Sequence, residues 1–149
     1  MKRFRVQQID HVELFVRSRR EAAAWYGRVL GCDIVADVES WARDPMGPLM
    51  ISSDLGETKL ALFRGKPQGS LPPSGIIRVA FRVSGEGFVD FLKRLESLSL
   101  SNSDGAAVTA QKVVDHGGAF SIYFCDLDGN ALEVTTYDVE AVTARLEGE

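Results

Sequence analysis

The feature that most constrains this chain is an internal repeat of one strand–helix–three-strand pattern. Each half begins with four apolar residues at the same spacing. They are Ile9, Val12, Leu14 and Val16 in the first half, and Ile76, Val79, Phe81 and Val83, each 67 positions later, in the second half. A second apolar pair, Leu60 and Leu62, recurs 72 positions later as Leu132 and Val134. The larger second offset predicts a longer loop in the second half. One such unit cannot bury its sheet face alone, so we expect the two repeats to share one structure.

The first half is expected to contain a strand over 9–16, a helix, and strands over 34–38, 49–52 and 59–63. Ser18 and Glu21 have the spacing of a capping box at the start of the helix. Gly31 lies where the helix should end. Trp25 and Tyr26 fall on the apolar stripe of the helix, so we assign them to the core.

The second half repeats this order, with a strand over 76–83, a helix that begins after Ser84, and a strand near 112–114. Residues 65–75 contain three prolines and little apolar content, which is typical of a linker. We therefore predict a single domain over 1–149, with modules at 8–64 and 76–138. A C-terminal helix or tail, with its helix near 139–146, should follow over 139–149.

Residues 120–134 predict a hairpin with two different faces. Ser121 and Tyr123 alternate with apolar residues, which indicates a strand. Asp128-Gly129 favours a two-residue turn. Tyr123 and Glu133 should then share the polar face, with His116 at its mouth. A phenol, a carboxylate and an imidazole on one sheet face need partners, water or a functional role.

Composition excludes several classes of partner. The net charge is −4 and no basic cluster is present, which argues against nucleic acid. No apolar run approaches the ~20 residues that cross a bilayer, and the start of the chain does not resemble a secretion signal. Cys32 and Cys125 lack metal-ligand spacing, so we expect free thiols in a reducing cytoplasm.

The element order, the helix sequence from Trp25 to Gly31 and the closing sequence from Asp126 to Glu133 resemble the vicinal oxygen chelate superfamily. Its members include glyoxalase I, bleomycin and fosfomycin resistance proteins and type I extradiol dioxygenases. The resemblance implies an α+β fold of two tandem βαβββ modules. These would form a curved, open, eight-stranded mixed sheet around a central cleft, with helices on the outer face.

The same resemblance implies a divalent metal in the cleft, with ligands on the first and last strand of each module. The matching positions are His11, Ala61, Arg78 and Glu133. Alanine has no donor atom, and a permanently charged arginine has no lone pair to offer. The metal ligands would be His11 and Glu133, holding Fe, Mn, Mg, Zn or Ni, or no metal at all.

A second resemblance concerns the extradiol dioxygenase signature, whose spacing is followed by Val114, His116, Tyr123, Asp126, Gly129 and Glu133. It implies that His116 and Tyr123 contact the substrate as catalytic residues. The pattern departs at Leu127, where a proline is expected. The second iron-binding histidine corresponds to Arg78, so an intact two-histidine, one-carboxylate iron site is absent from the sequence.

Further residues of the predicted cleft are candidates for substrate binding. Arg78 and Arg82 share a strand face, and Lys59 is expected to face the same cleft from the other module. Two alternatives stay open: the two arginines contact Glu13 and Glu133, or the cations form a floor that holds a substrate carboxylate. Glu13 and Phe15 lie on the same strand face as His11.

Three functions are compatible with these residues. The favoured one is a divalent-metal-linked enzyme that acts on a small molecule with vicinal oxygens, as a lyase, isomerase or ring-cleaving dioxygenase. The second is a metal-free acid–base enzyme with His11 or His116 as base and Arg78 as its electrostatic partner. The third is a resistance or sequestration protein that binds a small molecule. A homodimer is expected, because open sheet edges favour pairing with a second copy.

Overall fold

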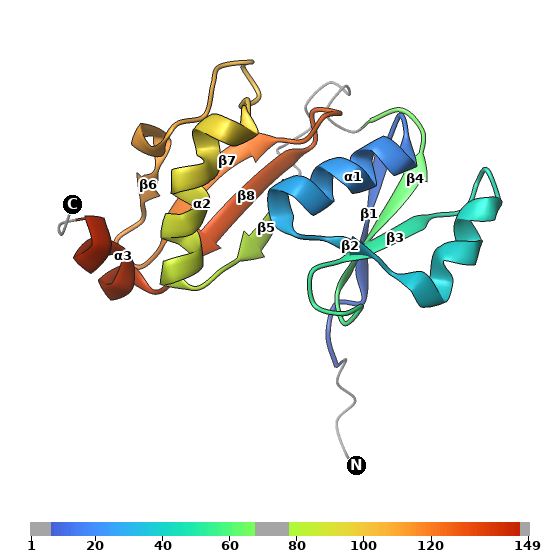
Figure 1. The fold of residues 1–149 in the computed structure, drawn as a ribbon, viewed down its shortest axis with the longest axis horizontal. Helices are drawn as coiled ribbons and strands as arrows, with labels where there is room; N and C mark the ends of the chain where they lie inside the picture. The colour runs from blue at the N-terminus through green and yellow to red at the C-terminus, as the bar shows by residue number, and fades with distance from the viewer. Residues whose placement is uncertain (1–6, 68–77, 147–149) are drawn as a thin grey trace, which may run out of the picture. The chain divides into compact units, whose positions relative to one another are not determined.

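The computed structural model describes residues 7–67 and 78–146. The chain divides into two compact units, Met1–Leu71 and Pro72–Glu149, each with its own mixed sheet and helices (Figure 1). The protein is therefore an α+β protein of two tandem modules, as predicted. Most of the predicted linker over 65–75 lies outside the described residues.

The first unit contains a four-stranded sheet in the order β1-β4-β3-β2. β1 pairs parallel with β4, whereas the other neighbours are antiparallel. Its elements are β1 (His11–Val16), α1 (Arg19–Leu30), β2 (Asp33–Ile34), the 3-10 helix η1 (Ala36–Arg43), β3 (Leu49–Ser52) and β4 (Lys59–Arg64).

The second unit repeats this topology in the order β5-β8-β7-β6. Its elements are β5 (Arg78–Arg82), α2 (Gly85–Leu98), the 3-10 helix η3 (Ala110–Lys112), β6 (Val114–Asp115), β7 (Phe120–Cys125), β8 (Ala131–Thr136) and α3 (Val139–Leu146). In the parallel pairs, His11 lies opposite Lys59, and Arg78 lies opposite Ala131. These partners are separated by the two offsets that the sequence predicts, so the repeat is confirmed at the level of strand register.

One helix packs against each sheet and completes its core. Ser18 accepts the Glu21 N–H at the start of α1, and Gly31, with φ +68°, ends that helix in the left-handed region that favours glycine. Trp25 and Tyr26 are buried, as expected. In the second unit α2 lies along β7 and β8, where Phe91 packs on Phe124 with ring centroids 5.6 Å apart (Figure 1). In the part of the chain that the structure covers, no helix is long and apolar enough to cross a bilayer.

Two of the predicted strands differ from the structure. The strand predicted over 34–38 ends at Ile34, and the chain continues as η1. The last ladder bond runs from Val35 N–H to Met50 O, and the next residues include Asp37 and Glu39, which disfavour a strand. The strand near 112–114 is also shorter, because η3 occupies residues 110–112 and only two residues pair in β6.

The turn of the second hairpin is longer than the two-residue turn predicted from Asp128-Gly129. Cys125 and Ala131 are the last paired residues, and Asp126 N–H still donates to Asn130 O. Gly129 has φ +83° and its N–H donates to Asp126 O. These features fit a three-residue loop with glycine in the left-handed position. The buried Asp126 carboxylate accepts from the N–H groups of Asp128 and Asn130 at 2.8 and 2.9 Å.

Replacing Asp126 by alanine should therefore destabilise the hairpin. Its carboxylate also accepts from the Asn130 side-chain amide at 2.8 Å, so several buried donors lose their acceptor together. We expect Asp126→Ala to lower the free energy of unfolding by about 2–3 kcal/mol in urea denaturation. Asp126→Asn keeps one carbonyl acceptor and should lose roughly half as much. Equal stability of all three proteins would contradict this role.

Candidate functional site

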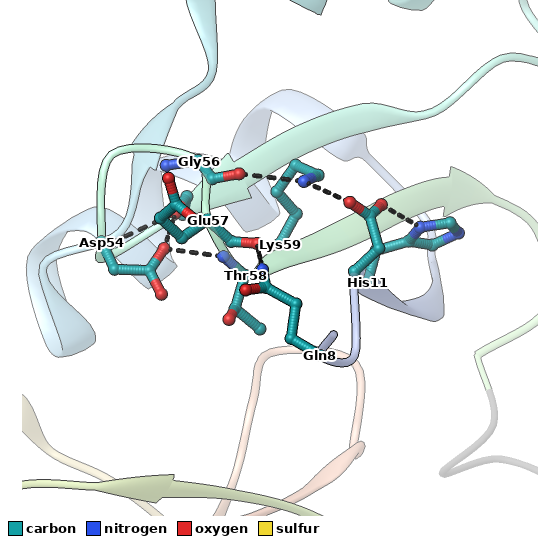
Figure 2. A network of polar contacts seen from close by, with 9 residues as sticks. Gln8, His11, Asp54, Gly56, Glu57, Thr58 and Lys59 are labelled. Atoms are coloured by element: carbon teal, nitrogen blue, oxygen red, sulfur yellow. Dashed lines mark hydrogen bonds and ion pairs between the residues drawn. The ribbon is translucent and has the colours of Figure 1, made fainter. Parts of the chain in front are cut away.

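A polar cluster forms where β1 and β4 begin. Parallel pairing places His11 beside Lys59, and Asp10 precedes His11 in the chain. The Asp10 carboxylate accepts from Lys59 Nζ at 2.8 Å and from His11 Nδ1 at 2.8 Å. Lys59 Nζ also donates to Gly56 O at 2.9 Å, so the ammonium links the strand to the preceding turn (Figure 2).

The contact with Asp10 decides which ring nitrogen of His11 is available. A carboxylate can only accept, so His11 Nδ1 carries the proton and, in the neutral ring, Nε2 keeps a lone pair. Nε2 lies 3.8 Å from Glu13 Oε1, beyond hydrogen-bond distance. Asp10 thus holds the imidazole in the state that suits a metal ligand or a base. Hydrogen bonds from Lys59 and then His11 lower the pKa of Asp10.

A cavity of about 380 Å³ adjoins this cluster within the first unit. Its polar lining includes Asp10, His11 and Lys59, and its remaining lining comes from β3, η1 with the residue before it, and the turn after β3. The volume lies in the ~300–1,000 Å³ range of small-molecule sites. The lining residues are Asp10, His11, Val35, Asp37, Val38, Trp41, Met50, Leu55, Gly56 and Lys59.

A second polar cluster lies on the sheet of the second unit. Tyr123 on β7 pairs with Glu133 on β8, and both side chains are half-buried. The Arg78 guanidinium carbon lies 4.3 Å from the centre of the Tyr123 ring, in the geometry of a cation–π contact. The Tyr123 hydroxyl is 3.0 Å from His116 Nε2. Arg78, Tyr123 and His116 are therefore in contact, as the predicted shared face implies.

Glu133 has a partner that the sequence analysis did not include. The buried Ser121 hydroxyl donates to Glu133 Oε1 at 2.7 Å and lies 3.0 Å from the Thr135 hydroxyl. One carboxylate oxygen of Glu133 is thus held by the sheet itself. A half-buried carboxylate that is fixed in this way is already oriented for a ligand.

The repeat relates the proposed ligand positions of the two units. Glu13 pairs with Ala61, and at the equivalent place Ala80 pairs with Glu133. Each unit therefore has one carboxylate at this pair, but on the first strand in one unit and on the last strand in the other. Arg78 occupies the position equivalent to His11. Across residues 7–67 and 78–146, no three His, Cys, Asp or Glu side chains form a group that could hold a metal.

The other predicted site residues lie in different parts of the two units. His11 and Glu133 belong to different units, so their shared ligation stays a prediction. Phe15 packs on Phe63, with ring centroids 6.1 Å apart, and does not line the cavity. Glu13 is exposed beside His11. Arg82 lies 5.3 Å from the Tyr137 ring centre, at a separate hollow of about 460 Å³.

Reasoning from the sequence missed three residues of these clusters. Asp10 could have been found, because a carboxylate next to a candidate histidine ligand is a common orienting partner. Ser121 was noted only for its alternation with apolar residues. Trp41 was missed because its segment follows a stretch interpreted as a strand, and the structure places it at the cavity on η1.

The two units share one fold, and each carries a polar cluster on its sheet face. The family model of the Glyoxalase/Bleomycin resistance protein/Dioxygenase superfamily matches residues 8–134. The chain belongs to this superfamily, which confirms the resemblance found in the sequence.

A named relative and two solved structures are similar to this chain. The metallothiol transferase FosB of Staphylococcus haemolyticus is 27% identical over 139 residues, which cover 91% of this chain and 87% of FosB. A putative glyoxalase family protein from Bacillus anthracis has a TM-score of 0.64 at 20% identity, over 91% of this chain and 99% of that one. The fosfomycin resistance protein FosX from Listeria monocytogenes, complexed with Mn(II) and sulfate ion, has a TM-score of 0.63 at 15% identity, over 95% and 99%. The two structural matches support the fold alone.

The Asp10 cluster leads to a prediction about pH. Because Lys59 is the main cause of the lowered Asp10 pKa, Lys59→Met should raise that pKa toward its ordinary value, as measured by NMR titration of the side-chain carboxyl. A carboxyl pKa that is lowered in the folded state stabilises the fold at neutral pH. This contribution to stability is lost as the pH falls through the folded-state pKa. Asp54, whose pKa is lowered mainly by Ser52, is the internal control. A parallel change at Asp54 would mean that the substitution perturbs the whole turn.

Proposed function

We propose that this chain binds a small molecule through an oxyanion at Arg78, and that His116 and Tyr123 exchange a proton with it. The observation that carries this proposal is the arginine at the position equivalent to His11. A guanidinium cannot ligate a metal, but it offers five N–H donors in a planar arrangement that matches a carboxylate or phosphonate. The proposed function is therefore that of an acid–base enzyme or binding protein for oxyanionic small molecules.

The surroundings of Arg78 support this role. The side chain is exposed and rests on Tyr123, which leaves the edges of the guanidinium open. Among the residues that the structure describes, no carboxylate forms an ion pair with Arg78. The FosX protein of Listeria monocytogenes, which shares the fold, forms a complex with a sulfate ion. Sulfate is an oxyanion of the proposed shape.

The pair of His116 and Tyr123 supports the proton exchange. A hydrogen bond of 3.0 Å joins Nε2 to the hydroxyl, so a proton can pass between the ring and a ligand through the phenol. His116 is exposed and lies on the turn before β7, where a ligand could reach it. Such geometry is a requirement for a general acid or base.

Replacement of Arg78 tests the proposal. We expect fosfomycin or sulfate to bind the native chain measurably in isothermal titration calorimetry. Arg78→Met should weaken this binding roughly 10- to 100-fold, the range for losing hydrogen bonds to a charged group. Arg78→Lys should lie between, because an ammonium keeps the charge but not the paired donors.

The matched control is Arg145→Met, which removes the same charge from α3, where Arg145 pairs with Glu86 at 3.0 Å. This control should bind like the native chain. If Arg78→Met and Arg145→Met both bind each oxyanion as the native chain does, the proposed role of Arg78 is wrong. If the anion binds and no product forms, the protein is a binding protein. If turnover occurs and Tyr123→Phe leaves its rate and pH profile unchanged, the proposed role of Tyr123 in proton exchange is wrong.

A divalent-metal-linked enzyme is the second candidate. His11 offers a lone pair on Nε2, Glu133 offers a carboxylate, and the relative FosB is named a metallothiol transferase. These two donors do not complete the set of four metal-ligand positions that the superfamily resemblance implies, however, because Ala61 and Arg78 occupy the other two. Catalytic zinc sites usually keep three protein ligands. Any Fe, Mn, Mg, Zn or Ni would have to be held by His11 and Glu133 with added water.

Metal uptake tests this candidate directly. After dialysis against a chelator, the chain would be titrated with Mn(II), and free Mn(II) would be followed by electron paramagnetic resonance. Two protein ligands should give weak, saturable uptake that desalting removes. His11→Ala and Glu133→Gln should each abolish it, whereas Glu140→Gln on α3 should not. Lack of uptake by the native chain would end this candidate without affecting the oxyanion proposal.

A further inference from the structure

The cavity of the first unit has an apolar rim that the fold alone does not explain. Leu55 is fully exposed at 104% and has φ +60°. A leucine in this left-handed region is strained, typically by ~1–2 kcal/mol, and glycine would avoid the strain. The Leu55 side chain is thus not buried by folding, and its backbone conformation is unfavourable. Strained residues of this kind are concentrated at ligand sites.

The turn that presents Leu55 is held in place by its neighbours. The Ser52 hydroxyl accepts the Gly56 N–H at 2.9 Å and donates to Asp54 Oδ1 at 2.6 Å. Asp54 Oδ1 also accepts the Thr58 N–H at 2.9 Å (Figure 2). These bonds fix the turn without using the leucine side chain. Leu55 is therefore displayed on a rigid loop beside the cavity.

An exposed indole also lines this cavity. Trp41 on η1 is 52% exposed, whereas Trp25, the other tryptophan of the chain, is 4% exposed. The cavity wall also contains the apolar side chains of Val35, Val38 and Met50. Exposed large apolar side chains around one hollow are typical of binding surfaces.

The charges that line the cavity favour a cation. Asp10 is compensated by Lys59 and His11, which bind its two oxygens. Asp37 also lines the cavity, and no cation within the described residues forms an ion pair with it. Two carboxylates therefore face one ammonium. A cation is also the charge that an indole ring attracts.

We propose that this cavity binds a small organic cation that carries an aromatic or other apolar group. The apolar part would lie between Trp41 and Leu55, and the charged part would face Asp37. This inference goes beyond the proposed function and uses residues of the first unit only. A loss of oxyanion binding at Arg78 would leave it untouched, and the converse also holds.

A matched set of naphthalene probes tests the proposal on the full chain. The cation 1-naphthylmethylammonium should quench Trp41 emission in a saturable way. The neutral 1-naphthalenemethanol should bind at least threefold more weakly, because it lacks the attraction of a charge near Asp37. The anion 1-naphthoate should bind at least tenfold more weakly than the cation, since the excess carboxylate repels it.

Substitutions test separately the charge of Asp37, the indole ring of Trp41 and the rim residue Leu55. Binding is followed by the fluorescence anisotropy of the naphthalene probe. Asp37→Asn should weaken the cation about three- to fivefold, a screened surface interaction. Glu39→Gln removes the same charge from the same 3-10 helix, where Glu39 pairs with Arg20 at 2.7 Å, and should leave binding unchanged. Trp41→Ala should weaken binding about five- to tenfold, and Trp41→Phe should restore most of it.

Leu55→Gly separates binding from stability. This substitution should weaken binding of the cation, while the melting temperature stays equal or rises because the strain at φ +60° is removed. A fall in melting temperature together with unchanged binding would mean that Leu55 is structural. The proposal as a whole is overturned if the cation binds no better than the anion, or if Asp37→Asn and Glu39→Gln behave alike.

Discussion

The parallel pairing between the first and last strand of each unit is the constraint on which the rest of the structure depends. It places the beginnings of β1 and β4 side by side, and so brings Lys59 within reach of Asp10, which precedes β1. In the second unit the same pairing places Arg78 and Ala131 together, and antiparallel β7 adds Tyr123 beside Glu133. Both polar clusters follow from strand register rather than from any local motif.

This dependence explains what the sequence could reveal. Apolar periodicity predicted the order of elements, the repeat and the shared face of Tyr123 and Glu133, because a period-2 pattern fixes which side chains share a face. Contacts such as Asp10 with Lys59 link residues 49 positions apart, and periodicity carries no information on rotamers. The 3-10 helix with Trp41 was not predicted, because tertiary pairing ended β2 after two residues and nothing in the apolar pattern marks that point.

The two units have the same strand topology but different polar side chains at equivalent positions. At the equivalent pair of positions, the carboxylate lies on the first strand as Glu13 in one unit and on the last strand as Glu133 in the other. His11 is likewise matched by Arg78, so a nitrogen lone pair in one unit is replaced by a permanent cation. The equivalent buried pairs Leu60 and Leu62, and Leu132 and Val134, are by contrast apolar in both units. Duplicated sheets can thus diverge at their polar faces without a cost to the core.

The turn that carries Leu55 has a consequence for how such a protein can change. Its hydrogen bonds come from Ser52 and Asp54, at or just after the end of β3, and the side chain at its tip, Leu55, is fully exposed. The side chain at the tip of this turn can therefore be replaced while the hydrogen bonds that hold the turn are kept. New side chains there would alter ligand selectivity without changing the sheet. Adaptation to a new compound could therefore begin at one solvent-facing position.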